Sequence, residues 1–230
     1  MRTRLRVMRI GILGGTGPAG SALGLRLASV GYEVVLGSRE VQRSVHICDD
    51  LIRSWPEFVL DLVGGSNDDA AKCDLVIIAT PWDSAAKVVN EHTHDLVGKI
   101  VVTMANALVR VGKEFQPLVP PRGSIAAHVQ AEIPLSKVVA AFQHLPATEL
   151  ARLGHEVDSD VLICSDDPTA TAVVSEIVAK IPGCRPLNAG TLSNALAIEA
   201  FTAVLLQLNV RYKTRVAPRL TGIPDRRETV

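Results

Sequence analysis

One glycine pattern near the start of the chain constrains its fold more than any other feature. An apolar run, Met8 to Leu13, leads into Gly15-Thr16-Gly17-Pro18-Ala19-Gly20, and an amphipathic stretch over Pro18 to Val30 follows directly. A G-x-G-x-x-G spacing between a strand and a helix is typical of the unit that binds a dinucleotide. We therefore expect a strand, a glycine loop and a helix here, with a phosphate site at the start of the helix.

The glycines of this loop have separate physical tasks. Gly15 permits a tight turn, Gly17 lets the backbone approach a pyrophosphate, and Gly20 brings the helix against the sheet. Pro18 suits the first helical turn, where a missing N–H costs nothing. Backbone N–H groups at the positive end of the helix then face the diphosphate, so the remaining loop residues are expected to contact it as well, namely Thr16 and Ala19. A glycine turn without a ligand is the alternative reading.

Further short apolar runs predict the rest of the sheet. They cover Glu33 to Leu36, Cys73 to Ala79, Ile100 to Met104 and Lys137 to Phe142. Val, Ile and Leu follow one another there without polar alternation, which is typical of parallel strands covered on both faces. The predicted fold class is α/β, a doubly wound Rossmann-type parallel sheet.

The pattern continues after Pro146 and then changes near residue 190. We expect a strand at Asp160 to Cys164, a helix at Pro168 to Lys180 and a short strand at Arg185 to Leu187, which together make one more βαβ unit. A long helix from Leu192 to Lys213 follows. We therefore divide the chain into a Rossmann-type domain, 8–190, and a small helical C-terminal segment, 191–230.

The end of the second strand indicates which dinucleotide binds. A carboxylate about twenty residues after the glycine loop holds the ribose 2′-hydroxyl of NAD, but this strand ends in Gly37-Ser38-Arg39, and the first carboxylate is Glu40. Ser38 can donate a hydroxyl, Arg39 offers a bidentate guanidinium, and Arg43 lies one helical turn further on. These residues favour NADP. They could also simply solvate the start of a helix.

Two other strand ends are expected to border the ligand, because ligands of such sheets bind at the carboxyl ends of the strands. Thr80 and Pro81 follow the strand at Cys73 to Ala79, and the proline turns the chain away from the sheet. Met104 and Asn106 follow the next strand and lie on the same edge.

Composition and charge exclude several classes of protein. Lys and Arg together number 24, as do Asp and Glu, so no overall field draws the chain to nucleic acid or an anionic membrane. The four cysteines are scattered without metal-ligand spacing, which indicates reduced thiols and a cytoplasmic protein. The basic start, Met1 to Val7, is interpreted as a short leader rather than a signal peptide.

The most apolar long stretch is interpreted as a subunit-interface helix rather than a membrane span. Leu192 to Val210 contains polar groups that lipid would leave without partners, namely Asn194, Glu199, Gln207 and Asn209. So much apolar surface on a small segment requires cover, and we expect a homodimer.

An ordered set of motifs resembles the NADPH-dependent reductases of the deazaflavin coenzyme F420. The set runs through most of the chain: GILGGTGPAG, VVLGSRE, ATPW, VVAAFQHLPA, DVLICSDDP and RPLNAGTLSNA. The resemblance implies that NADP(H) binds the Rossmann domain and that F420 is the co-substrate. It implies an NADP site made by Thr16, Ser38, Arg39 and Arg43, and a deazaflavin beside His144, Leu145 and Pro146. Some members of the family carry a histidine one position earlier, where this chain has Gln143.

The implied reaction requires no catalytic side chain and no metal. Hydride passes directly between the nicotinamide and the deazaflavin, so the protein contributes proximity, orientation and exclusion of water. The acidic tail of F420 would need a local basic patch, and Arg211 to Arg219 supplies four cations, followed by Arg226 and Arg227. The alternatives are an NADPH-dependent imine or carbonyl reductase on the same scaffold and a non-catalytic NADP-binding sensor.

Overall fold

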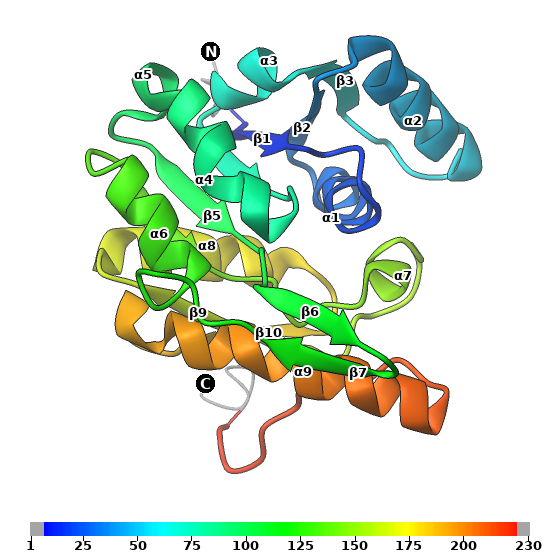
Figure 1. Ribbon diagram of the computed structural model, residues 1–230. Coiled ribbons are helices and arrows are strands. Elements are labelled where there is room, and N and C mark those ends of the chain that lie inside the picture. The colour runs from blue at the N-terminus through cyan, green and yellow to red at the C-terminus, as the bar shows by residue number, and fades with distance from the viewer. Residues whose placement is uncertain (1–6, 225–230) are drawn as a thin grey trace.

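The computed structural model describes residues 7–224, and one eight-stranded sheet lies at its centre (Figure 1). The predicted leader therefore lies outside the described residues except for Val7. The strand order across the sheet is β10-β9-β8-β5-β4-β1-β2-β3. The bounds are β1 (Arg9–Leu13), β2 (Glu33–Ser38), β3 (Leu62–Ser66), β4 (Leu75–Ile78), β5 (Ile100–Thr103), β8 (Lys137–Ala140), β9 (Ser159–Ser165) and β10 (Cys184–Asn188).

Helices cover both faces of the sheet, which confirms the predicted α/β class. One face carries α1 (Pro18–Ser29), α2 (Val41–Ser54) and α8 (Pro168–Lys180), and their apolar residues share a core with the sheet. The second core lies under α3 (Asn67–Ala71), α4 (Trp82–Glu91), α5 (Thr93–Leu96) and α6 (Ile125–Glu132). Burial on both sides explains why the strands are continuous apolar runs in the sequence.

The strand directions differ in one place from the parallel sheet that the sequence predicts. Six neighbouring strands of the sheet, in the order β3-β2-β1-β4-β5-β8, pair in parallel. In contrast, β9 runs antiparallel to β8, and β10 is parallel to β9. The predicted strand at Lys137 to Phe142 ends at Ala140, and Phe142 has a left-handed backbone with φ of 71°. The chain turns there and re-enters the sheet from the carboxyl edge. An apolar run carries no sign of its direction, so the sequence pattern could not show this.

The long C-terminal helix is docked on the domain by polar contacts as well as apolar ones. A short turn, η1 (Leu192–Asn194), leads into α9 (Ala195–Tyr212), which ends at the left-handed residue Lys213. The buried carboxylate of Glu199 accepts hydrogen bonds from the backbone N–H groups of Ile125 (2.9 Å) and Ala126 (3.0 Å), at the start of α6. An antiparallel hairpin of β6 (Leu108–Val111) and β7 (Glu114–Pro117) packs beside α9 (Figure 1).

The helix formed by η1 and α9 is long and apolar enough to cross a membrane. It is the one such helix in the part of the chain that the structure describes. Its polar contacts are those of a helix packed on a folded domain. Glu199 caps α6, Thr202 donates to Asn106, and Gln207 accepts from the backbone of Phe115. The division of the chain near residue 190 stays a prediction.

Candidate functional site

A pocket opens where the sheet reverses its strand order, between β1 and β4. This is the point at which ligands bind in open α/β sheets. The cavity has a volume of about 420 Å³. Seven of the residues expected from the sequence line it, namely Thr16, Gly17, Ser38, Arg39, Arg43, Thr80 and Pro81. The other lining residues are Gly14, Glu40, Asn67, Ala79, Ser84, Lys87, Val88 and Glu91.

The sequence predicts Gly15 as the glycine that permits the tight turn of the loop, but the residue with the left-handed backbone is Gly14. Gly14 has φ of 68°, and a Cβ there would lie 2.6 Å from Cγ2 of Thr80. Gly15 has an ordinary backbone, donates its N–H to the carbonyl of Gly37 (2.9 Å), and would place a Cβ 3.0 Å from Cα of Leu36. Gly15 is therefore needed for close packing, and Gly14 for the backbone conformation.

The next two glycines have the surroundings that the fingerprint requires. A Cβ on Gly17 would meet one backbone oxygen at 3.8 Å and would otherwise point into open space, which leaves room for a phosphate against the backbone. A Cβ on Gly20 would lie 2.9 Å from Cβ of Ala79, so this glycine holds α1 against the sheet. Pro18 is the first residue of α1, followed by Ala19, and no side chain of the described residues caps the helix start. Its first N–H groups are therefore left for a ligand.

Two arginines stand at the pocket rim without a protein partner for their side chains. In the described part of the chain, the guanidinium groups of Arg39 and Arg43 make no ion pair and no hydrogen bond, and both residues are exposed. Ser38 is 8% exposed, and its Oγ accepts from the N–H of Glu40 at 3.1 Å. Glu40 lines the same rim, directly before α2. This arrangement offers two cations and a hydroxyl to a dianion.

Asn67 is a pocket residue that the sequence analysis missed. Its Oδ1 accepts the N–H of Gly14 at 3.2 Å, so it holds the glycine loop from the end of β3, two strands away in the sheet. A Cβ on Gly37 would lie 2.9 Å from the same oxygen, so the asparagine needs a glycine there. The signal in the sequence was the helix start Ser66 to Asp69, where both side chains form a capping box.

The far wall of the pocket is one face of α4, which the sequence analysis also missed. Ser84, Lys87, Val88 and Glu91 lie at helical spacing and all line the cavity. Lys87 and Glu91 form an exposed pair at 4.0 Å. Polar residues at this spacing are typical of any solvent-exposed helix face, so the sequence did not indicate a pocket here.

Thr80 presents an unused polar atom at this pocket. Its Oγ1 is buried and has no hydrogen-bond partner among the described residues. Buried polar atoms are normally paired, and an unpaired one beside a cavity fits a site that a polar ligand completes. Pro81 follows and sits directly before α4, as its turn-forming role requires.

The residues after β5 belong to the core and to α9 rather than to the pocket lining. Met104 is 8% exposed and packs in the main apolar core. Asn106 accepts a hydrogen bond from Oγ1 of Thr202 at 3.1 Å. Neither residue is among those that line the pocket.

The segment expected beside the deazaflavin is tightly anchored at the same edge of the sheet. Nε2 of His144 lies 2.7 Å from the carbonyl of Ile198, and its ring meets Phe201 edge to face at 5.4 Å. A carbonyl only accepts, so Nε2 carries the proton and Nδ1 is the acceptor. Burial lowers the pKa of His144, which keeps the ring neutral. His144 therefore positions the segment against α9.

The neighbours of His144 are fixed as well. Gln143 is 7% exposed and donates from Nε2 to the carbonyl of Thr103 at 3.1 Å, at the end of β5. Leu145 is buried in the core, and Pro146 leads into α7 (Ala147–Leu150). With the left-handed Phe142 before them, these residues form a buried bend that hydrogen bonds hold to β5 and α9.

Three of the four cations in the basic C-terminal segment have acidic partners within the protein. Arg211 pairs with Glu114 (4.0 Å), Arg215 with Glu149 (3.9 Å), and Arg219 with Asp158 and Asp160 (3.5 Å each). Arg226 and Arg227 lie outside the described residues. The sequence showed four cations in this segment but could not show these acids, which come from distant positions.

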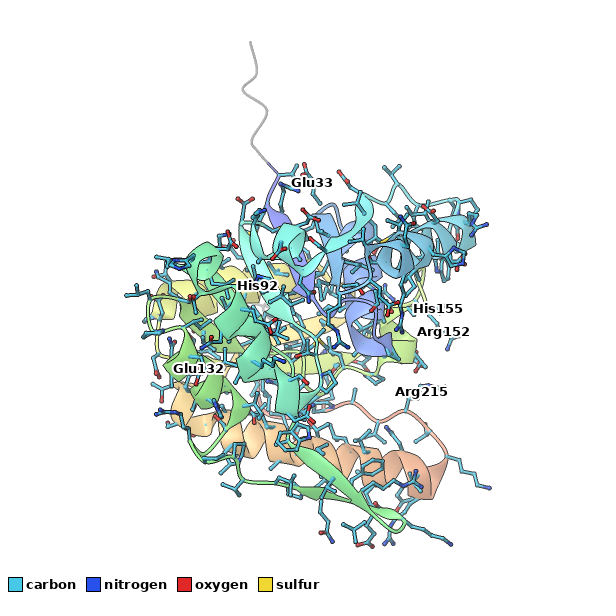
Figure 2. The ribbon with its side chains drawn as sticks, turned by 45° about the horizontal axis from the view of Figure 1, so that its top comes forward. Glu33, His92, Glu132, Arg152, His155 and Arg215 are labelled. Atoms are coloured by element: carbon cyan, nitrogen blue, oxygen red, sulfur yellow. The ribbon has the colours of Figure 1, made fainter. Side chains whose placement is uncertain are left out.

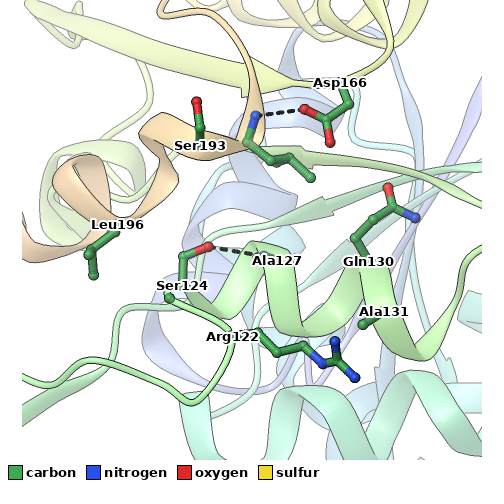
Figure 3. Close-up of a pocket in the computed structure, with 10 residues that line it drawn as sticks. Arg122, Ser124, Ala127, Gln130, Ala131, Asp166, Ser193 and Leu196 are labelled. Carbon is green, nitrogen blue, oxygen red and sulfur yellow. Dashed lines mark hydrogen bonds between the residues drawn. The ribbon is translucent and has the colours of Figure 1, made fainter.

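A second cavity of about 450 Å³ lies between the start of α6 and η1 (Figure 3). Two of its polar side chains already have partners: Oγ of Ser124 accepts from the N–H of Ala127 at 3.0 Å, and Asp166 accepts from that of Leu192 at 3.0 Å. None of the residues expected from the sequence lines this cavity. We assign no function to it.

Comparison with known proteins identifies the relatives of this chain. A family model described as NADP oxidoreductase, coenzyme F420-dependent, matches residues 9–107. The F420-dependent NADP reductase of Methanocaldococcus jannaschii is 36% identical over 213 residues, 90% of this chain and 95% of that protein. The chain belongs to the F420-dependent NADP reductase family.

A second curated relative agrees with this assignment, and a solved structure shares the fold. The F420-dependent NADP reductase of Methanothermobacter marburgensis is 31% identical and covers 95% of this chain and 100% of that protein. A solved structure from Arthrobacter sp. FB24, described as a candidate F420-dependent NADP reductase, shares the fold with a TM-score of 0.77 at 24% identity, and the match covers 92% of this chain and 100% of that one.

Proposed function

We propose that this protein transfers hydride between NADP(H) and coenzyme F420. The observation that carries the proposal is the pocket at the strand-order reversal, where the open side of Gly17 meets a rim formed by Ser38, Arg39 and Arg43. A pyrophosphate fits the first part and a 2′-phosphate the second. The chain's relatives, named F420-dependent NADP reductases, supply the second coenzyme.

The balanced reaction is NADPH, a proton and oxidised F420 giving NADP⁺ and reduced F420. The nicotinamide supplies the hydride from C4, and the deazaflavin accepts it at C5. The protein holds both rings in place and excludes water, which is the main source of rate for such a transfer. We assign no catalytic acid, base or metal to it. Among the residues that the structure describes, no group of three or more potential metal ligands lies together.

The deazaflavin is proposed to lie at the carboxyl edge of the sheet, between the end of the dinucleotide pocket and the buried bend around His144. Met104 and Asn106 occupy the strand end between these two places. His144 contributes by fixing the bend through Ile198, since its donor nitrogen is already used. Because Arg211, Arg215 and Arg219 are paired with acids, we assign no contact with the acidic tail of F420 to that segment.

We also propose that the protein is a cytoplasmic homodimer. One face of α9 exposes Phe201 (38%) and Val204 (49%), which lie three positions apart on the helix. A second copy would cover this apolar face. The four cysteines are unpaired, as expected for a reducing compartment. Sedimentation velocity tests the dimer, and a single monomer peak at all concentrations would exclude it.

The activity is tested by mixing the protein with NADPH and purified F420 and following the deazaflavin absorbance. Loss of that absorbance, in proportion to NADPH oxidised, is the expected result. NADPH oxidation with a small imine or carbonyl compound and none with F420 would indicate the alternative reductase. Tight NADPH binding without turnover on any acceptor would indicate a sensor.

A further inference from the structure

A buried arginine on α1 connects the dinucleotide unit with the bend expected beside the deazaflavin. Arg26 is 2% exposed, although it lies on a helix where an arginine would ordinarily reach solvent. Its guanidinium donates to four backbone carbonyl groups, those of Glu149 (3.0 Å), Leu150 (2.9 Å), Arg152 (2.7 Å) and His155 (3.1 Å).

No acid compensates this buried charge within the described part of the chain. Arg26 has no ion pair there, and burial lowers the pKa of its guanidinium. A charge removed from water without a counter-ion is unfavourable, and methionine or leucine would fill the same space without that penalty. What an apolar side chain cannot supply is a planar fork of five donors in fixed directions. The four carbonyl groups that the guanidinium binds therefore explain why an arginine stands at position 26.

Those carbonyl groups belong to α7 and to the turn that follows it. The segment continues directly from Gln143 to Pro146, the bend at the carboxyl edge of the sheet. On the other side, Arg26 belongs to the helix whose first turn forms the phosphate end of the pocket. Figure 1 shows α7 lying against α1.

The same segment has anchors on its other sides. His144 is bonded to Ile198 on α9, and Glu149 pairs with Arg215 after that helix. Arg152, His155 and Arg215 lie on one flank of the molecule in Figure 2. Arg26 is the anchor that starts from the helix of the glycine loop.

We infer that Arg26 is a positioning residue for hydride transfer, fixing the deazaflavin-side bend relative to the helix that binds the dinucleotide phosphates. This inference rests on the proposed function. The two rings must meet at close to reacting distance, and a displacement of about 1 Å costs on the order of 100-fold in rate. A guanidinium bonded to four carbonyl groups restricts that displacement without touching either coenzyme.

The test compares three variants. Arg26→Met keeps the volume of the side chain and removes its donors, and Arg26→Lys keeps the charge with a different donor geometry. Lys99→Met is the matched control, because Lys99 also donates to a distant backbone carbonyl, that of Ala71 (2.7 Å), at the opposite edge of the sheet. Circular dichroism and the melting temperature establish folding, and Arg26→Lys serves as the readout if Arg26→Met does not fold.

Single-turnover hydride transfer at saturating coenzymes should fall roughly 10- to 100-fold in Arg26→Met. The Kd for NADPH should stay within about 2-fold, and Arg26→Lys should remain at least about 5-fold slow, because charge alone does not restore the four bonds. Amide hydrogen exchange over residues 147–155 should speed up in both variants. Lys99→Met should leave the transfer rate and this exchange unchanged.

Two results would overturn the inference. One is a folded Arg26→Met with a normal transfer rate. The other is a loss of rate that tracks weaker NADPH binding, which would make the residue merely structural. If the unmodified protein does not reduce F420, the proposed function is wrong, and the exchange of residues 147–155 then tests the tether by itself. Unchanged exchange would exclude it.

Discussion

The buried carboxylate of Glu199 should make the stability of this protein fall as the pH rises. Glu199 is 2% exposed and is held only by the backbone N–H groups of Ile125 and Ala126. Burial raises the pKa of its carboxyl from 4.5 to about 7, against the opposing effect of those two hydrogen bonds. The folded protein therefore keeps a proton that the unfolded chain has already released.

The sign and size follow from linkage. Below pH 4.5 the group is protonated in both states and does not affect the balance. As the pH rises toward 7, the unfolded chain binds fewer protons than the folded one, so the free energy of unfolding falls. The difference between the two pKa values corresponds to about 3 kcal/mol in total, of which about 2.5 kcal/mol falls between pH 5 and pH 8.

The assay is urea unfolding of the natural protein and of Glu199→Gln at pH 5, 6, 7 and 8. The variant's amide oxygen can accept one N–H, while its NH₂ group faces the other, so the variant carries a penalty that does not depend on pH. Subtracting its free energy of unfolding also removes the contribution of other acids, such as Asp160. The advantage of the natural protein should shrink by about 2.5 kcal/mol over this range.

A flat difference across the pH range would refute this reasoning. It would mean that the start of α6 offsets the burial completely and that Glu199 ionises at its ordinary pKa in the folded protein. An advantage that grows with pH would mean that the carboxylate form is the one that the fold favours.

The remaining predictions concern the coenzyme sites. Arg39→Ala should weaken NADPH binding roughly 10- to 100-fold, because the lost contact is worth about 1.5 to 3 kcal/mol. The affinity for NADH should stay nearly unchanged. If fluorescence titration shows that the affinities for NADPH and NADH fall equally, Arg39 is structural. Gly17→Val should fold normally by circular dichroism and bind no NADPH, because the added side chain enters the phosphate space. Gly20→Val, the control, should instead be destabilised by its contact with the sheet. His144→Ala should raise the KM for F420 and leave the Kd for NADPH unchanged, and a fall in kcat at constant KM would instead place the ring in the transition state.

Elements with a strong periodic pattern were predictable from the sequence. The helix at Pro168 to Lys180 has the predicted bounds, since proline and an aspartate cap mark its start and a buried strand precedes it. The glycine loop and the rim at Ser38 and Arg39 also lie where a strand–loop–helix unit puts them. Local spacing decides these features, and local spacing is what a single sequence records.

Features that depend on distant partners were not predictable. The hairpin at Leu108 to Pro117 is mostly exposed, so its strands have no buried face to produce a regular pattern. Arg26 and Glu199 look like solvated helix residues until their partners, more than 70 positions away, are placed beside them. Likewise, the turn residue Gly14 follows β1, and its partner Asn67 begins α3, 53 positions further along the chain.

The most direct test of the central claim is to follow the hydride itself. NADPH carrying deuterium at both C4 positions is oxidised by the protein in the presence of F420, and the reduced coenzyme is analysed by mass spectrometry and NMR. Direct transfer between two rings held by the protein predicts one deuterium at C5 of the reduced deazaflavin, with none lost to solvent. A reduced deazaflavin that carries solvent hydrogen at C5, or NADPH oxidation that leaves F420 unreduced, would contradict the account.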